Sequence, residues 1–170
     1  MAAANVLSLV FAVPFTVAYL AAFAGVWGLN ALVGGVFAFL GNLPVLLAAF
    51  LLGIVGHEAI HAITWAAAGK MPLSSIHMGF QWKTLTPYAH CREPMEVNAY
   101  RIGALMPGLV VGILPALAGI ITGSGWLLMF GLFFTVAAGG DMLILWLIRG
   151  VPAGQMVEDH PSQAGCYVIE

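Results

Sequence analysis

Residues 43–68 read LPVLLAAFLLGIVGHEAIHAITWAAA and decide what kind of protein this is. The run is long and apolar enough to cross about 30 Å of hydrocarbon as a helix. His57, Glu58 and His61 nevertheless lie within five positions inside it. Ionisable side chains in a membrane span cost several kcal/mol each and usually mark function. This stretch therefore predicts both a membrane protein and the place of its chemistry.

The composition of the whole chain is typical of a protein that is surrounded by lipid. Of 170 residues, 62% are hydrophobic and 7% are charged, whereas a soluble domain carries about 25% charged residues. The net charge of −2 excludes the basic surface that nucleic-acid binding needs. The first apolar run has no preceding Lys or Arg, unlike a cleaved secretory signal, so we expect it to be retained as a span.

We predict an all-α membrane protein that forms a single polytopic membrane domain over residues 1–170. The four apolar stretches that can serve as transmembrane helices are approximately residues 6–27, 43–68, 102–121 and 126–148. Residues 30–42 are also apolar, and we expect them to extend the first span or to form a re-entrant piece.

The basic residues predict the orientation of these spans. All five lie after the second span or after the fourth: Lys70, Lys83, Arg92, Arg101 and Arg149. With four spans these positions share one side, which the positive-inside rule makes cytoplasmic. The insert at about 70–100, the tail 149–170 and both termini are then cytoplasmic. We expect an integral protein of a bacterial or archaeal inner membrane.

The polar insert is expected to contain a small β-hairpin. Ile76, Met78, Phe80 and Trp82 alternate with more polar residues, which is typical of a half-buried strand. Residues 84–91 favour a second strand, which Pro87 would confine to a sheet edge. The alternative is an irregular loop on the lipid headgroups. A hairpin could bind an extended substrate as a further strand or serve only as a cap.

The segment Gly56–His61, GHEAIH, has the spacing of a zinc hydrolase. His57 and His61 are four residues apart and share a helix face, so both imidazoles can bind one ion. Glu58 stands beside that ion as the base that activates a zinc-bound water. The alternative is a structural pair of histidines that bond across the helix bundle with Glu58 as their partner.

A catalytic zinc site usually has three protein ligands, and Asp141 is the predicted third. It is the only acidic residue in the other three spans. His61 lies nine residues before Lys70, and Asp141 lies eight before Arg149. These separations correspond to depths of roughly 14 and 12 Å from the same membrane face. The alternative is a buried Asp paired with a histidine or a helix end, with His160 as reserve ligand.

The remaining cytoplasmic histidines and cysteines are candidates for a second metal site, although no pair has the spacing of a zinc finger. They are His77, His90, Cys91, His160 and Cys166. We expect the tail segment EDHPSQAGC to form a loop that covers the bundle.

HEAIH inside a span, followed by an intramembrane Asp, resembles the site-2 protease class of intramembrane zinc metalloproteases. The chain is most similar to a bacterial family of zincin peptidases with the same compact four-span layout. The resemblance also covers KTLTPYAHCREPM, Gly139-Gly140-Asp141 and EDHPSQAGC. It implies Zn²⁺ held by His57, His61 and Asp141. The class usually carries the third ligand in Asn-Pro-Asp-Gly, where this chain has Gly-Gly-Asp-Met.

The predicted function is that of a zinc-dependent intramembrane peptidase, with membrane proteins or peptides as substrates and lipid as surroundings. One alternative is a non-catalytic metal-binding membrane protein, which would need no carboxylate between its histidines. Another is a metal or proton transporter that uses buried His and Asp as a relay. A homo-oligomer could supply the symmetry that such a transporter usually has.

Overall fold

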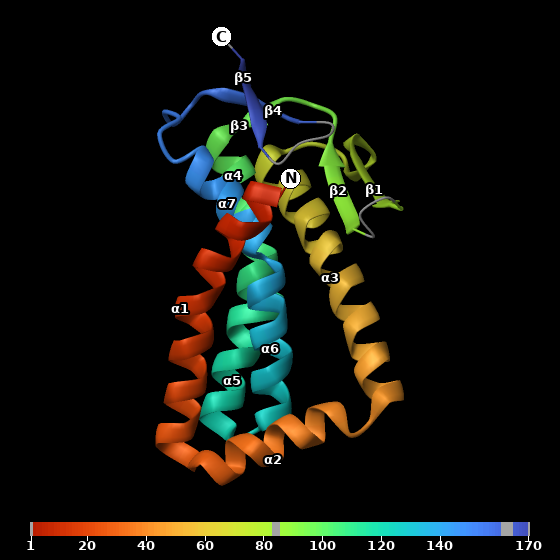
Figure 1. The fold of residues 1–170 in the computed structure, drawn as a ribbon. Helices are drawn as coiled ribbons and strands as arrows, with labels where there is room; N and C mark the ends of the chain where they lie inside the picture. Colours follow the sequence, from red (N-terminus) through yellow and green to blue (C-terminus); the bar gives the residue numbers. More distant parts are fainter. Residues whose placement is uncertain (1, 83–85, 161–164, 170) are drawn as a thin grey trace. The chain divides into compact units, whose positions relative to one another are not determined.

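The computed structural model describes residues 2–82, 86–160 and 165–169. Four helical segments are long and apolar enough to cross a membrane: Val10–Trp27, Leu43–Gly69, Val97–Thr122 and Gly125–Leu147 (Figure 1). These segments confirm the four predicted spans as apolar helices. The third begins at Val97 rather than near Ile102, because its first turn is amphipathic and escapes a search for continuous apolar sequence.

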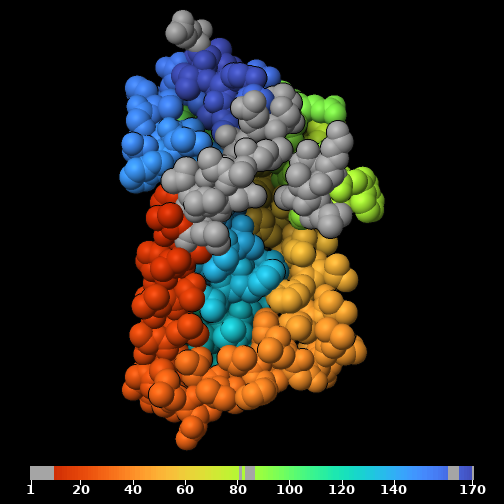
Figure 2. Space-filling model, in the orientation of Figure 1, coloured from red at the N-terminus to blue at the C-terminus, as the bar shows by residue number. Residues whose placement is uncertain are grey.

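The apolar residues after the first span form a helix of their own. Helix α1 (Ala2–Trp27) ends at Gly28, whose φ of +85° breaks the helical path, and α2 (Leu29–Leu40) follows. Its residues therefore do not extend the first span. Several of its side chains, such as Phe37, are exposed, and Figure 2 shows α2 in orange at the surface.

Helix α3 (Leu43–Gly69) has clear start and stop signals. The side chain of Asn42 accepts a hydrogen bond from the Val45 N–H at 3.3 Å, as an N-cap residue does. At the other end Lys70 has a φ of +54°, and Pro72 follows, which cannot continue a helix. The bounds of the helix that carries HEAIH are thus set by its own sequence.

The chain folds as two compact units, which we describe separately. The first unit comprises residues up to Gly53 together with Gly108–Gly139. It contains α1, α2, the start of α3, a π-helical turn η2 (Gly108–Ile113), α5 (Leu114–Thr122) and α6 (Gly125–Ala137). Its core holds Tyr19, Phe23, Ala116, Leu128 and Leu132.

Glycines let the helices of the first unit approach closely. A Cβ on Gly131 would lie 2.2 Å from the Ala116 backbone nitrogen, and one on Gly112 would lie 2.8 Å from that of Thr135. Small residues at helix contacts are typical of membrane bundles. This unit is held together mainly by such backbone-to-backbone packing and by aromatic rings.

The second unit comprises Ile54–Pro107 and Gly140–Glu170. After α3 it contains the short helix η1 (Leu73–Ser75), strands β1 (Ile76–Gln81), β2 (Thr86–Cys91) and β3 (Met95–Glu96), and helix α4 (Val97–Pro107). Helix α7 (Gly139–Leu147) and strands β4 (Met156–Asp159) and β5 (Cys166–Ile169) complete it. This unit contains His57, Glu58 and His61 from α3 and Asp141 from α7.

Strands β1 and β2 form the predicted antiparallel hairpin, with Ile76 opposite Cys91 and Gln81 opposite Thr86. Pro87 lies in β2, which pairs on one side only, as expected for a strand with a missing donor. Residues 84 and 85 of the predicted second strand lie outside the described residues. The antiparallel strand pair is therefore present, and its position at the cytoplasmic face stays a prediction.

A second small sheet, which was not predicted, includes strands from the tail. Strands β3, β4 and β5 form an antiparallel sheet in which Met95 pairs with Val157 and Val157 with Val168. Strands of two to four residues are too short to show the alternation that identifies a strand. In the tail segment EDHPSQAGC, Glu158 and Asp159 belong to β4 and Cys166 to β5, and residues 161–164 lie outside the described residues.

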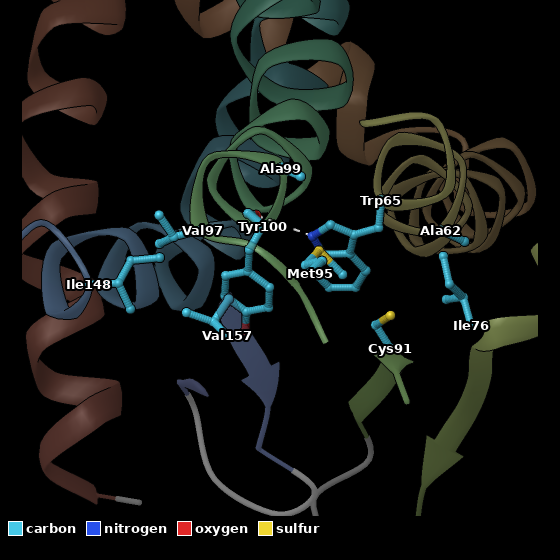
Figure 3. Packing of buried hydrophobic residues seen from close by; sticks show 10 residues of the cluster. All are labelled: Ala62, Trp65, Ile76, Cys91, Met95, Val97, Ala99, Tyr100, Ile148 and Val157. Atoms are coloured by element: carbon cyan, nitrogen blue, oxygen red, sulfur yellow. Dashed lines mark hydrogen bonds between the residues drawn. The ribbon is translucent and has the colours of Figure 1, made fainter. Parts of the chain in front are cut away.

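The core of the second unit gathers side chains from nearly all of these elements (Figure 3). Its buried members are Ala62, Trp65, Ile76, Cys91, Met95, Val97, Ala99, Tyr100, Ile148 and Val157. Both sheets therefore pack against the end of α3 and the start of α4. This packing fixes the helix segments that carry the polar residues.

Candidate metal centre

His57 and His61 lie on one face of α3, as their spacing predicts. Their ring centroids are 5.0 Å apart, and their side chains are 12% and 7% exposed. Helical residues four apart are neighbours on the surface of a helix. Protein therefore encloses two imidazoles on one face of α3.

Asp141 reaches the same point from α7. Helix α6 ends at Ala137, Ala138 leaves the helical conformation, and α7 begins at Gly139. This break occurs without the proline that the site-2 motif has. Asp141 then falls in the first turn of α7, where the partial positive charge of a helix N-terminus favours a carboxylate. The helix break at Ala138 therefore places the Asp141 carboxylate at the start of a new helix.

The three side chains converge on one point. His57 Nε2 lies 3.1 Å from Asp141 Oδ2, and His61 Nε2 lies 3.4 Å from Asp141 Oδ1. The three potential ligand atoms are all within 4.8 Å of one another. Residues 84 positions apart are therefore brought together as the depth argument predicts.

The geometry and donor types fit zinc. Zinc takes nitrogen and carboxylate ligands at about 2.0–2.2 Å, and a tetrahedral arrangement puts its ligands roughly 3.4 Å apart. The two measured separations of 3.1 and 3.4 Å are close to that edge. Three protein ligands leave the fourth corner for water or substrate, as in catalytic sites. Among the described residues these are the ones that could hold a metal.

A backbone carbonyl orients His61. Its Nδ1 lies 3.0 Å from the Gly103 carbonyl oxygen, and because a carbonyl only accepts, Nδ1 must carry the proton. Nε2 is then the nitrogen that can bind a metal, an arrangement typical of metal-ligating histidines. Pro107, four residues after Gly103, has no N–H to donate to that carbonyl. Pro107 thus leaves the Gly103 oxygen available to His61.

An aromatic stack supports the same imidazole from behind. The Trp65 ring lies 5.0 Å from the His61 ring at 23°, and 5.5 Å from the Tyr100 ring at 12°. Trp65 Nε1 donates to the Tyr100 carbonyl at 3.1 Å, the dashed line in Figure 3. Trp65 and Tyr100 are 4% and 1% exposed. The ring of His61 is therefore held by packing as well as by a hydrogen bond.

Glu58 lies next to the three candidate ligands. It is close enough to His57, His61 and Asp141 to interact electrostatically with each, and the backbone N–H of Ala89 in β2 donates a hydrogen bond to its carboxylate. The hairpin therefore contacts the predicted catalytic base directly.

The other candidate ligands lie elsewhere. His90 Nδ1 binds the Asp159 carboxylate at 2.9 Å, and His160 Nε2 pairs with the Tyr167 hydroxyl at 2.9 Å. Cys91 and Cys166 are free thiols, and burial raises the pKa of both. In the described part of the chain, none of these residues belongs to a group of three or more potential metal ligands.

Some residues around the centre were not predicted. Trp65 continues the i, i+4 series of His57 and His61, so the helix period could have identified it. Pro107 four residues after Gly103 was a second readable signal, because it predicts a free carbonyl inside a helix. Nothing in the sequence indicated the contact of Ala89 with Glu58, since it depends on how the hairpin packs.

A family model described as "Putative zincin peptidase" matches residues 50–156, which is well over half of the chain and includes the whole centre. No curated protein and no solved structure matches the chain. The family implies zinc as the metal, and the His57, His61 and Asp141 cluster could bind it. The chain belongs to the zincin peptidase family described by that model.

Proposed function

We propose that this protein is a zinc-dependent intramembrane peptidase that hydrolyses peptide bonds of membrane proteins or peptides. The observation that carries the proposal is the convergence of His57 and His61 on Asp141, at 3.1 and 3.4 Å, with Glu58 beside them. All four residues belong to helices apolar enough to cross a membrane. A buried structural cluster would not need the additional carboxylate of Glu58.

In this mechanism His57, His61 and Asp141 would hold the metal, and Glu58 moves protons. Zinc, when bound, supplies the Lewis acidity that polarises a water and a peptide carbonyl. The Glu58 carboxylate takes a proton from the attacking water and returns it to the departing amine nitrogen. The Ala89 N–H holds one end of that carboxylate. The Gly103 carbonyl keeps His61 in the tautomer that presents Nε2.

The surroundings of the centre support a substrate that is locally unfolded. A helical substrate satisfies its backbone bonds internally and must unwind before a peptide bond becomes available. The β1–β2 hairpin offers an edge to which an extended segment can add, and its strand β2 contacts Glu58 through Ala89. On the positive-inside argument the hairpin, both termini and the tail face the cytoplasm.

The proposal is tested with purified full-length protein in lipid nanodiscs, as wild type, His57→Ala, Asp141→Ala and Glu58→Gln. We expect about one zinc per wild-type chain by mass spectrometry, and loss of that zinc in the two ligand variants. Glu58→Gln should keep its zinc but cleave a transmembrane test peptide about 10²–10⁴-fold more slowly. Equal cleavage by wild type and Glu58→Gln would remove Glu58 as the base.

The same preparations distinguish the alternative functions. A structural metal site would retain zinc while none of the proteins cleaves any of a panel of transmembrane peptides. A transporter would move zinc or protons across proteoliposomes, and Asp141→Ala would abolish that flux. Either result would replace the peptidase proposal.

A further inference from the structure

The carboxylate of Asp159, at the end of strand β4, joins three segments of the second unit. Its Oδ1 accepts a hydrogen bond from the Tyr100 hydroxyl at 2.8 Å. Its Oδ2 accepts from His90 Nδ1 at 2.9 Å and from the Cys91 N–H at 3.4 Å. The Asp159 side chain is 12% exposed. Hydrogen bonds to a largely buried carboxylate are stronger than neutral ones, so this group fixes its donors.

One path leads from Asp159 to the proposed base. His90 and Cys91 directly follow Ala89 in β2, and Ala89 donates its N–H to Glu58. Asp159 holds both the His90 ring and the Cys91 backbone. Because these are adjacent residues of one strand, the direction of the Ala89 N–H depends on that anchor.

A second path leads from Asp159 to a proposed ligand. Asp159 holds the hydroxyl of Tyr100, and the Tyr100 ring stacks on Trp65, which stacks on His61. Tyr100 also lies one turn before Gly103, whose carbonyl accepts from His61. Displacement of Tyr100 would therefore disturb both the stack and the helix turn that orient the imidazole.

We infer that Asp159 is a positioning residue of the centre, which aligns Glu58 through Ala89 and aligns His61 through Tyr100 and Trp65. The inference rests on the proposed function. It makes strand β4 of the tail a part of the catalytic apparatus rather than a cover. Asp159 touches neither the reacting atoms nor the metal ligands; it acts through strand β2 and helix α4.

The test compares Asp159→Asn and Tyr100→Phe with two matched controls. Glu158→Gln removes a carboxylate from the adjacent, exposed position of the same strand. Tyr167→Phe removes a hydroxyl from the neighbouring strand β5, where it pairs with His160. Each full-length variant is measured for zinc affinity, by competition with a chelator, and for kcat and KM per folded, zinc-loaded protein.

We expect the two test variants to lose about 10- to 100-fold in kcat or in zinc affinity, as partners of metal ligands typically do. KM should change little, and both controls should resemble the wild type. A fall in kcat with zinc retained supports the path to Glu58, and a fall in zinc affinity supports the path to His61. Tyr100→Phe keeps the stacked ring, so it remains informative where Asp159→Asn does not fold.

Two results would overturn the inference. In the first, both test variants have the same kcat and the same zinc affinity as the controls. The other is a loss of activity that disappears when rates are expressed per folded protein, because a merely structural bond would behave in that way. The cleavage assay with Glu58→Gln tests the proposed peptidase function. The zinc affinity of the Asp159 and Tyr100 variants tests the positioning role even if no peptide is cleaved, so the two proposals can fail separately.

Discussion

The two units of this chain hold their helices together by different means. In the first unit, Gly131 packs directly against the backbone of Ala116, and the Phe50 and Phe133 rings lie 4.3 Å apart. Its threonine hydroxyls bond to carbonyls four residues earlier, as Thr135 does to Gly131. These contacts depend on close steric fit rather than on polar bonds between distant parts of the sequence.

The second unit is joined by polar side chains across long stretches of sequence. Arg101 Nη2 donates to the carbonyls of Ile148 and Val151 at 2.6 and 2.7 Å, and Asp159 receives the Tyr100 hydroxyl. Such bonds are directional, and a buried group that loses its partner costs about 1–3 kcal/mol. Close steric fit thus suffices for the first unit, whereas the metal centre in the second unit depends on individual donors and acceptors.

The largest expected difference between the two units is their response to removal of zinc. Metal present at a thousandfold excess over its Kd stabilises a folded protein by about 4 kcal/mol, and all the candidate ligands belong to the second unit. We expect chelation to abolish peptide cleavage and to lower Tm. Hydrogen exchange should increase in Ile54–Pro107 and Gly140–Glu170 and stay nearly constant elsewhere. An equal increase in both units would contradict the division of roles.

Two matched glycine substitutions, one in each unit, test this difference. A Cβ on Gly103 would lie 2.0 Å from Trp65 Cδ1, and one on Gly131 would lie 2.2 Å from the Ala116 backbone nitrogen. Overpacking of this kind costs about 1–3 kcal/mol. We expect both Gly103→Ala and Gly131→Ala to lower Tm.

Zinc affinity should distinguish these two variants. Gly103→Ala displaces Trp65, which stacks on His61, and moves the carbonyl that accepts from His61, so its affinity should fall about tenfold. Gly131→Ala should bind zinc as the wild type does, because its clash lies in the first unit. Equal affinities, measured by chelator competition on folded protein, would refute the proposed support of His61.

The smallest effect that we expect is the pH-dependent contribution of the Glu96 carboxylate to stability. Hydrogen bonds from the backbone N–H groups of Gly154, Asn98 and Ala99 hold the pKa of its carboxyl below the ordinary value. A lowered pKa means that the ionised carboxylate stabilises the fold above the ordinary pKa of about 4.3. That contribution is lost as the pH falls through the lower, folded-state pKa.

Thermal unfolding of wild type and Glu96→Gln between pH 7 and 3 measures this contribution. The wild type should have the higher Tm at pH 7, because one amide oxygen cannot replace two charged acceptors. The difference should shrink as the pH falls below about 4. A difference that grows on acidification would show that the carboxylate is not stabilised in the folded state.

Much of the fold and most of the centre could be predicted because they depend on long, simple patterns. The apolar helices follow from runs of about 20 residues, and the pairing of His61 with Asp141 follows from helical rise and the positions of Lys70 and Arg149. The residues that surround these groups could not be predicted in the same way. Strand β4 is only four residues long, and Asp159 meets Tyr100 through tertiary packing that no local pattern encodes.

Helix α2 has a consequence for how the chain meets lipid. Its twelve residues span only about 18 Å, too short for a bilayer core of about 30 Å, and its sequence LNALVGGVFAFL contains no charged side chain. In the proposed membrane protein such a helix would contact lipid through apolar side chains alone, whereas polybasic anchors attract acidic headgroups. Its attachment should therefore be indifferent to ionic strength and to the proportion of anionic lipid.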